Sequence, residues 1–407
     1  FIFTAIISRS LSDEQAGLFF SLLSLLIVLT TLLIAGRDIC VMRLTTRYYV
    51  SKEFATIIKF QRLVKSQVFL TFLIAILIYF LVDYFCILTL LEKYNESIKV
   101  FALCMPFYAI TIINCELLRG VDNLQSLVLL HGIILPLLSS LFVLILIYFS
   151  TANLLLVCIM YFTTIFIVWV SSEFLWYRVK AKKILPFNYE KTKGAKKIRV
   201  DVSSYTSFAV IGIANVIMQY IPMLFLGLSS QPENAGLFFV ALKIATLLSF
   251  SLMAINVVIA PLMAQYYQLK DLKGLKNLLM VSNLVGFLTG VPIVVTLFLF
   301  GDIVLSFFGA VYVDAFDIMK ILLIGQFINA SSGSVLHLLM MTGYEKYVAL
   351  ITVLGVGIVF VIQFFIGEIS NLTLAWALTI AISVINIVSL ILSYFLVFSS
   401  KRLFQSG

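Results

Sequence analysis

The feature that most constrains this chain is the repeated occurrence of apolar runs of membrane-spanning length. The hydrocarbon core of a bilayer is about 30 Å thick and an α-helix rises about 1.5 Å per residue, so about 20 apolar residues span it. Such runs predict transmembrane helices near 17–36, 66–90, 100–118, 124–149, 153–177, 202–227, 236–263, 277–300, 316–341, 346–366 and 371–398.

The stretch at residues 1–9, FIFTAIISR, is apolar but too short to cross a bilayer. We interpret it as the end of a truncated first helix, and a cleaved signal peptide is the alternative. With this segment, the sequence predicts an all-α integral membrane protein of about twelve transmembrane helices.

Composition supports lipid as the solvent. The chain is 62% hydrophobic and 12% charged, whereas soluble domains are about 45–50% apolar and about 25% charged. The five cysteines stand singly in apolar runs without a metal-binding spacing, and the two histidines lie in separate apolar segments. The sequence therefore predicts neither a metal site nor a cofactor.

Basic residues predict the orientation. They cluster at 43–65, 178–199 and 270–276 and again at Lys401 and Arg402. The predicted loops on the opposite side of the membrane hold few basic residues beyond Arg9, Lys93 and Lys99. Because Lys and Arg concentrate in cytoplasmic loops, this asymmetry predicts a multi-pass protein with both chain ends in the cytoplasm. It also accounts for the net charge of +9 without nucleic-acid binding.

An internal repeat divides the chain. Ala-Gly-Leu-Phe-Phe occurs at 16–20 and again at 235–239, and Tyr-Tyr recurs in 44–53 and 262–271. A third match pairs 117–124 with 340–347 around one glycine. Six predicted helices separate the copies, so the halves share one orientation across the membrane. We expect six-helix bundles at 1–177 and 202–407, joined by a basic cytoplasmic linker at 178–201.

These motifs resemble the polysaccharide or O-antigen flippases of the MATE-like (MOP) exporter superfamily, as does Phe-Phe-Gly-Ala-Val-Tyr at 307–312. The resemblance implies two pseudo-symmetric bundles around a central cavity in a bacterial plasma (inner) membrane. It implies a monomer without a cofactor, which moves an undecaprenyl-pyrophosphate-linked oligosaccharide to the outer leaflet by alternating access. Other polysaccharide assembly proteins are the partners that this function would bring.

Ionisable residues inside predicted spans are the candidate functional residues. Lys243 lies within a span with no acidic residue at helical spacing, and it is either a cation facing a cavity or a side chain that reaches the interface. Arg37 stands next to Asp38 at a predicted helix end, and it is a local partner of Asp38, an interface anchor or a substrate-binding cation. Arg37 and Lys243 resemble in position the basic residues of the lipid-oligosaccharide flippases, and Arg9 is a third cationic candidate. Glu116 is a possible coupling carboxylate, or else the partner of Arg119 three residues on.

Two other functions compete with a flippase. A multidrug or cation antiporter of the same superfamily would favour acidic residues deep in the first half, where none is obvious. A membrane-embedded glycan polymerase, ligase or acyltransferase would be an enzyme, whereas we expect a transporter. Such enzymes usually need a large outer loop, and no predicted outer loop here exceeds about 20 residues.

Overall fold

The computed structural model describes residues 1–34, 37–86, 95–121, 128–149, 153–184, 202–227, 232–367 and 370–399. Within these ranges the backbone is helical apart from short turns, and no β-strand occurs. Contacts divide the chain into two compact units, Phe1–Ile213 and Ala214–Gly407. Among the described helices, eight are long and apolar enough to cross a membrane by length and composition.

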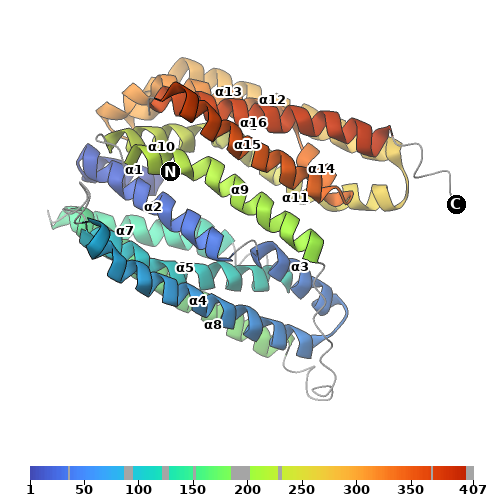
Figure 1. Cartoon of the computed structure of the whole chain (residues 1–407), viewed down its shortest axis with the longest axis horizontal. Coiled ribbons are helices and arrows are strands. Elements are labelled where there is room, and N and C mark those ends of the chain that lie inside the picture. The colour runs from blue at the N-terminus through green and yellow to red at the C-terminus, as the bar shows by residue number, and fades with distance from the viewer. Residues whose placement is uncertain are drawn as a thin grey trace. The chain divides into compact units, whose positions relative to one another are not determined.

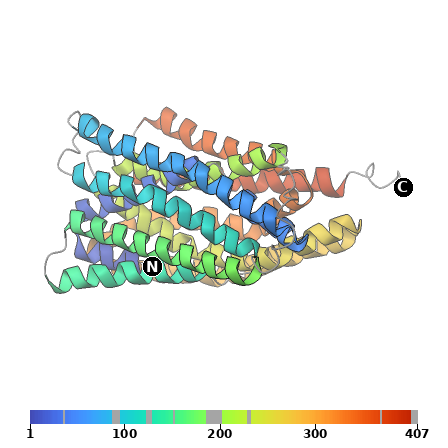
Figure 2. The same ribbon diagram turned by 90° about the horizontal axis from the view of Figure 1, so that it is seen from below.

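The first unit is organised around one helix, α5, which packs against α2, α3, α4 and α8. Figures 1 and 2 both show α4, α5 and α8 running side by side. The elements of this unit are α1 (Ile2–Ser10), α2 (Asp13–Ile34), α3 (Arg37–Val50), α4 (Phe54–Cys86), α5 (Asn95–Gly120), the π-helix η2 (Val128–Ile134), α7 (Leu135–Tyr148) and α8 (Leu154–Lys183).

In the second unit, α13 packs against α10, α12 and α16, and α16 also packs against α15. The boundary between the two units falls inside the helix α9 (Val202–Gly227), so its first part belongs to the first unit and the rest to the second. The following elements are α10 (Glu233–Ala245), α11 (Leu247–Gln268), α12 (Leu272–Ser306), the 3-10 helix η5 (Ala310–Ala315), α13 (Phe316–Ser332), α14 (Val335–Met341), α15 (Glu345–Ile366), α16 (Asn371–Ser393) and the π-helix η6 (Tyr394–Phe398).

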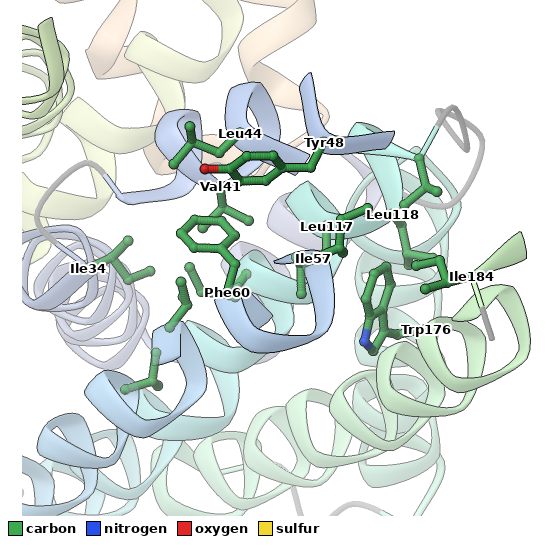
Figure 3. Close-up of a cluster of buried hydrophobic side chains, with 14 of the residues drawn as sticks. Ile34, Val41, Leu44, Tyr48, Ile57, Phe60, Leu117, Leu118, Trp176 and Ile184 are labelled. Atoms are coloured by element: carbon green, nitrogen blue, oxygen red, sulfur yellow. The ribbon is translucent and has the colours of Figure 1, made fainter. Parts of the chain in front are cut away.

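A buried apolar cluster fixes the ends of α3, α4, α5 and α8 against one another (Figure 3). Burying one large apolar side chain contributes about 1.5–3 kcal/mol. This cluster therefore holds together the end of the first unit that carries Arg43, Lys59 and Arg62, which we call the basic end. Its labelled members are Ile34, Val41, Leu44, Tyr48, Ile57, Phe60, Leu117, Leu118, Trp176 and Ile184.

The same tight turn ends α3 and α11. Lys52 and Lys270 have positive φ values of 58° and 59°. The Lys52 amide donates to Tyr49 O and the Glu53 amide to Tyr48 O, while Lys270 and Asp271 donate to Tyr267 O and Tyr266 O. Each set is a Schellman motif that satisfies the last helical carbonyls. The Tyr-Tyr match in the sequence therefore corresponds to a repeated local structure.

Two predicted spans are broken in the structure. The span at 236–263 is divided between α10 and α11 at Thr246, and the span at 316–341 between α13 and α14 at Gly333. The break at Thr246 lies in a mostly apolar stretch, LKIATLLSF at 242–250. The break at Gly333 lies in the short polar stretch NASSGS at 329–334, which a hydropathy window averages into the span.

Two predicted loops also differ from expectation. Lys59, Arg62 and Lys65, which we assigned to a loop, lie inside α4, because α4 begins at Phe54 with polar turns that precede its apolar stretch. The helix α8 continues to Lys183, and residues 185–201 of the predicted linker lie outside the described residues.

Candidate functional site

The candidate cation Lys243 lies ten residues into α10, in its last turn. Ten residues of helix rise about 15 Å, about half the hydrocarbon thickness, which is farther than a lysine side chain reaches. Within the described part of the chain, the Lys243 ammonium forms no hydrogen bond and no ion pair. Its Nζ atom lies 5.4 Å from the ring centroid of Phe239, one turn earlier on the same helix.

The break after α10 brings polar groups to this depth. Thr246 Oγ1 donates to the Lys243 carbonyl at 2.7 Å, and Ser249 Oγ donates to Gln326 Oε1 of α13 at 2.7 Å. A cation in the last turn also interacts favourably with the helix dipole. Lys243 is thus held at a helix terminus inside the apolar span, where its charge is partly stabilised before any ligand binds.

Lys243 stands apart from the other charged residues of the second unit. Among the described helices of this unit, the other charged side chains lie near helix ends that border a turn, a short 3-10 helix or a loop, whereas the end of α10 at Lys243 is followed directly by the apolar helix α11. Lys320 provides a direct comparison, because its Nζ lies 3.9 Å from the Phe316 ring centroid but also 2.9 Å from Asp317 Oδ1. Of these two lysines, Lys243 is the one without a carboxylate in the part of the chain that the structure describes.

Glu116 has the partner that its spacing suggested. Its Oε2 atom lies 3.6 Å from Nη1 of Arg119, and its side chain is 12% exposed. The Asp38 carboxylate of α3 is near enough to repel it. The structure therefore joins Glu116 to a local ion pair, and whether it couples transport to a cation stays a prediction.

The other two cationic candidates are less informative. Arg37 is the first residue of α3, and its side chain lies outside the described residues. Arg9 is exposed in the last turn of α1. Arg37 and Lys243 belong to different units, so their joint role stays a prediction.

Sequence reasoning missed a polar network inside the first unit. Lys65 of α4 donates to both carboxylate oxygens of Glu173 of α8, at 2.6 and 2.7 Å. Asn114 of α5 donates from Nδ2 to Glu173 Oε1 at 3.1 Å and to Ser172 Oγ at 2.9 Å. The asparagine is fully buried, so this network ties the three helices together inside the apolar unit.

Comparisons with known proteins place the fold. No family model matches the chain, and no curated protein matches it. A structure described as the inward-facing conformation of a multidrug resistance MATE family transporter of the MOP superfamily matches with a TM-score of 0.75. It is 14% identical, and the match covers 97% of this chain and 93% of that one.

A second match is a MOP superfamily transporter from Pyrococcus furiosus Vc1, whose description reports a reverse polarity of the binding pocket and suggests a different function. Its TM-score is 0.66 at 14% identity, covering 97% of this chain and 90% of that one. The chain therefore has the fold of the MATE transporters, which confirms the predicted all-α, MATE-like architecture.

Proposed function

We propose that this chain is a membrane flippase for lipid-linked oligosaccharides that moves a polyprenyl-pyrophosphate-linked glycan from the inner to the outer leaflet by alternating access. The observation that carries the proposal is Lys243, a cation about 15 Å into an apolar span by helix rise, with no carboxylate partner in the described chain. The MATE-like fold supports a transport function of this kind.

The chemistry of such a substrate fits a lysine at this depth. A polar glycan and its pyrophosphate cannot cross hydrocarbon unaided, whereas the polyprenyl tail can stay in the bilayer. A charged residue at a helix centre costs about 2.5–3.5 kcal/mol on insertion scales. A charge-assisted hydrogen bond contributes about 1.5–3 kcal/mol, so phosphate binding offsets much of this cost yet permits release.

A multidrug exporter is the second candidate, because the inward-facing MATE structure with a similar fold is described as a multidrug resistance transporter. Cationic drugs would call for an unpaired carboxylate inside the spans. Among the described side chains of the first unit, the interior carboxylates Glu116 and Glu173 both lie within 4 Å of a cationic group. This pairing favours an anionic substrate over a cationic one.

The experiment is a complementation assay in bacteria that lack their own flippase, with surface glycan as the readout. We expect Lys243→Ala to reduce surface glycan at least tenfold at unchanged membrane abundance. Lys243→Arg should keep part of the activity, because the charge survives although the geometry changes. Lys320→Ala is the matched control and should transport normally.

Normal surface glycan with Lys243→Ala at equal abundance would exclude the assigned role of Lys243. Export of cationic dyes by the purified protein, without movement of a lipid-linked glycan, would instead favour the multidrug alternative.

A further inference from the structure

An excess of positive charge surrounds the Lys65–Glu173 ion pair at the basic end of the first unit. Arg62 lies about one turn before Lys65 on α4, and Lys180 lies seven residues beyond Glu173 on α8. The charges of Arg62, Lys65 and Glu173 all act on Lys180. Three cations therefore share one carboxylate, and Lys65 already occupies both of its oxygens.

The two helices approach this cluster from opposite directions. α4 leaves the basic end and α8 returns to it, so Arg62 and Lys180 both lie on the same side of the ion pair. α4 and α8 each pack on α5, whose Asn114 is hydrogen-bonded to Glu173 between them. The ion pair and Asn114 thus fix the spacing of the helices that carry the two remaining cations.

We propose that Arg62 and Lys180 form a binding site for the phosphate of an anionic membrane phospholipid. Charge complementarity supports this occupant: within the described chain, Arg62 and Lys180 have no carboxylate of their own, and Arg62 is exposed. Both residues stand at the predicted cytoplasmic level, where anionic headgroups attract basic side chains. Guanidinium and ammonium groups are the usual partners of phosphate.

Native mass spectrometry of the purified protein in micelles with phosphatidylglycerol tests the site. The double variant Arg62→Gln/Lys180→Gln should lower phosphatidylglycerol occupancy about fivefold or more. The matched control is Lys273→Gln/Lys276→Gln, which removes two exposed charges at the start of α12. This control should retain wild-type occupancy, and the folded state of each variant is checked by its melting temperature.

An equal loss in both double variants would overturn the proposal, because it would show a general attraction to basic surface. Equal occupancy by phosphatidylcholine would overturn it too. Displacement of phosphatidylglycerol by millimolar inorganic phosphate would show that the residues bind free phosphate rather than a lipid.

A separate observation concerns α9, the helix in which the unit boundary falls, between Ile213 and Ala214. Before the boundary, Phe208 lies under the guanidinium of Arg43 of α3, 4.9 Å from Cζ to the ring centroid. After it, Met218 packs on the cluster of Val359, Ala377 and Ala381, and Phe225 contacts Phe360 at 6.0 Å between centroids. Each part of α9 therefore has side-chain contacts in the unit to which it belongs.

Gly212 stands next to this boundary. A Cβ atom added to it would have no neighbour within 4 Å, so packing does not require a glycine there. Glycine disfavours the interior of a helix because of its backbone freedom. We infer that Gly212 is a hinge in α9, at which the helix bends as the two units change their relative orientation. The inference rests on a transport function but not on the identity of the substrate.

Gly212→Ala tests the hinge, with Gly357→Ala of α15 as the matched control. Gly357 is also inside a helix with no neighbour within 4 Å of an added Cβ. Both variants should keep or raise the melting temperature. Gly212→Ala should slow transport about fivefold, while Gly357→Ala should transport like the wild type.

A substrate-independent readout separates failure of the hinge from failure of the proposed function. Spin labels at Ser51→Cys and Lys273→Cys, on a background without the native cysteines, report distances between the units. Gly212→Ala should narrow the distance distribution, and Gly357→Ala should not. An unchanged distribution together with unchanged transport would overturn the hinge.

Discussion

The two units contain matching turns but stabilise their interiors with different chemistry. In the first unit, an ion pair and an asparagine, Lys65–Glu173 with Asn114, join α4, α5 and α8. In the second unit, neutral side chains perform the corresponding role: Ser332 Oγ donates to Asn386 Oδ1 at 2.6 Å, and Ser282 and Ser334 are hydrogen-bonded at 2.7 Å. Lys65 and Asn283 occupy corresponding positions in the two halves, because each stands thirteen residues beyond the lysine with a positive φ, Lys52 or Lys270.

The difference shows which features of a repeated fold can differ between its two copies. Helix ends and turns recur because they satisfy backbone groups that every helix exposes. The side chains that link helices can diverge, provided that each buried polar group still finds a partner. The first unit therefore links its helices through a charged pair, whereas the second links its helices through neutral groups and carries Lys243 without a carboxylate in the described chain.

The largest expected effect in this comparison concerns the break between α13 and α14. Gly333 has a φ of 63°, and an added Cβ would collide with the side-chain amide of Asn283 and lie 2.8 Å from the Asn283 backbone nitrogen. Gly333→Ala should lower the free energy of unfolding by about 3 kcal/mol, from backbone strain together with overpacking. Urea unfolding in mixed micelles measures it.

Gly343→Ala is the control for this prediction, since Gly343 also has a positive φ of 89° but has open space around its Cβ position. It should cost less, about 1 kcal/mol. Equal losses at both positions would show that the polar contacts around Gly333 do not matter.

The ion pair of the first unit gives the next effect. Glu173→Ala leaves the Lys65 ammonium without its carboxylate and removes one hydrogen bond of Asn114. Because the two side chains are 24% and 35% exposed, we expect a loss of about 2 kcal/mol, below the 3–5 kcal/mol of a fully buried pair. Adding Lys65→Met to Glu173→Ala should reduce this loss in the free energy of unfolding, because the unpaired ammonium is then removed as well. If the losses of the two single variants simply add in the double variant, the pairing is contradicted.

The neutral network should respond more weakly. Ser332→Ala removes the hydrogen bond to Asn386, whose Nδ2 still donates to Asn329 Oδ1 and to Ile382 O. We expect a loss of about 1 kcal/mol in the free energy of unfolding. A loss larger than that of Glu173→Ala would reverse the ranking of the two networks.

The smallest effect tests the match between the two halves directly. Lys52→Gly and Lys270→Gly relieve a positive φ at equivalent turns, and each should stabilise the protein by about 0.5 kcal/mol, the relieved strain less the backbone entropy of glycine. The two changes in melting temperature should agree within error. Opposite signs would mean that the turns are not equivalent in energy.

Sequence patterns predicted the helices well where each helix is continuous. The predicted spans at 202–227 and 346–366 match α9 and α15 to within one residue. The breaks at Thr246 and Gly333 were not predicted, because a hydropathy window averages over the few polar residues at each break. Likewise, Lys65 and Glu173 are 108 residues apart, so no local pattern pairs them.

The candidate site was predictable in part. A lysine within an apolar run singled out Lys243 before its surroundings were visible, since charge inside a span is rare. Glu116 was given two alternative roles, a local pair with Arg119 or a coupling carboxylate, and the structure supplies the pair. The sequence could not show which groups surround each charge, because helices from elsewhere in the chain contribute those groups.

The central claim is that Lys243 binds the anionic group of a lipid-linked substrate, and a binding measurement tests it most directly. Wild-type protein and Lys243→Gln are titrated in micelles with a polyprenyl-pyrophosphate disaccharide and with an uncharged polyprenyl glycoside. We predict that the substitution weakens binding of the pyrophosphate lipid about tenfold, equivalent to about 1.4 kcal/mol, and leaves binding of the glycoside unchanged. Equal affinities of the two proteins for the pyrophosphate lipid would contradict the account.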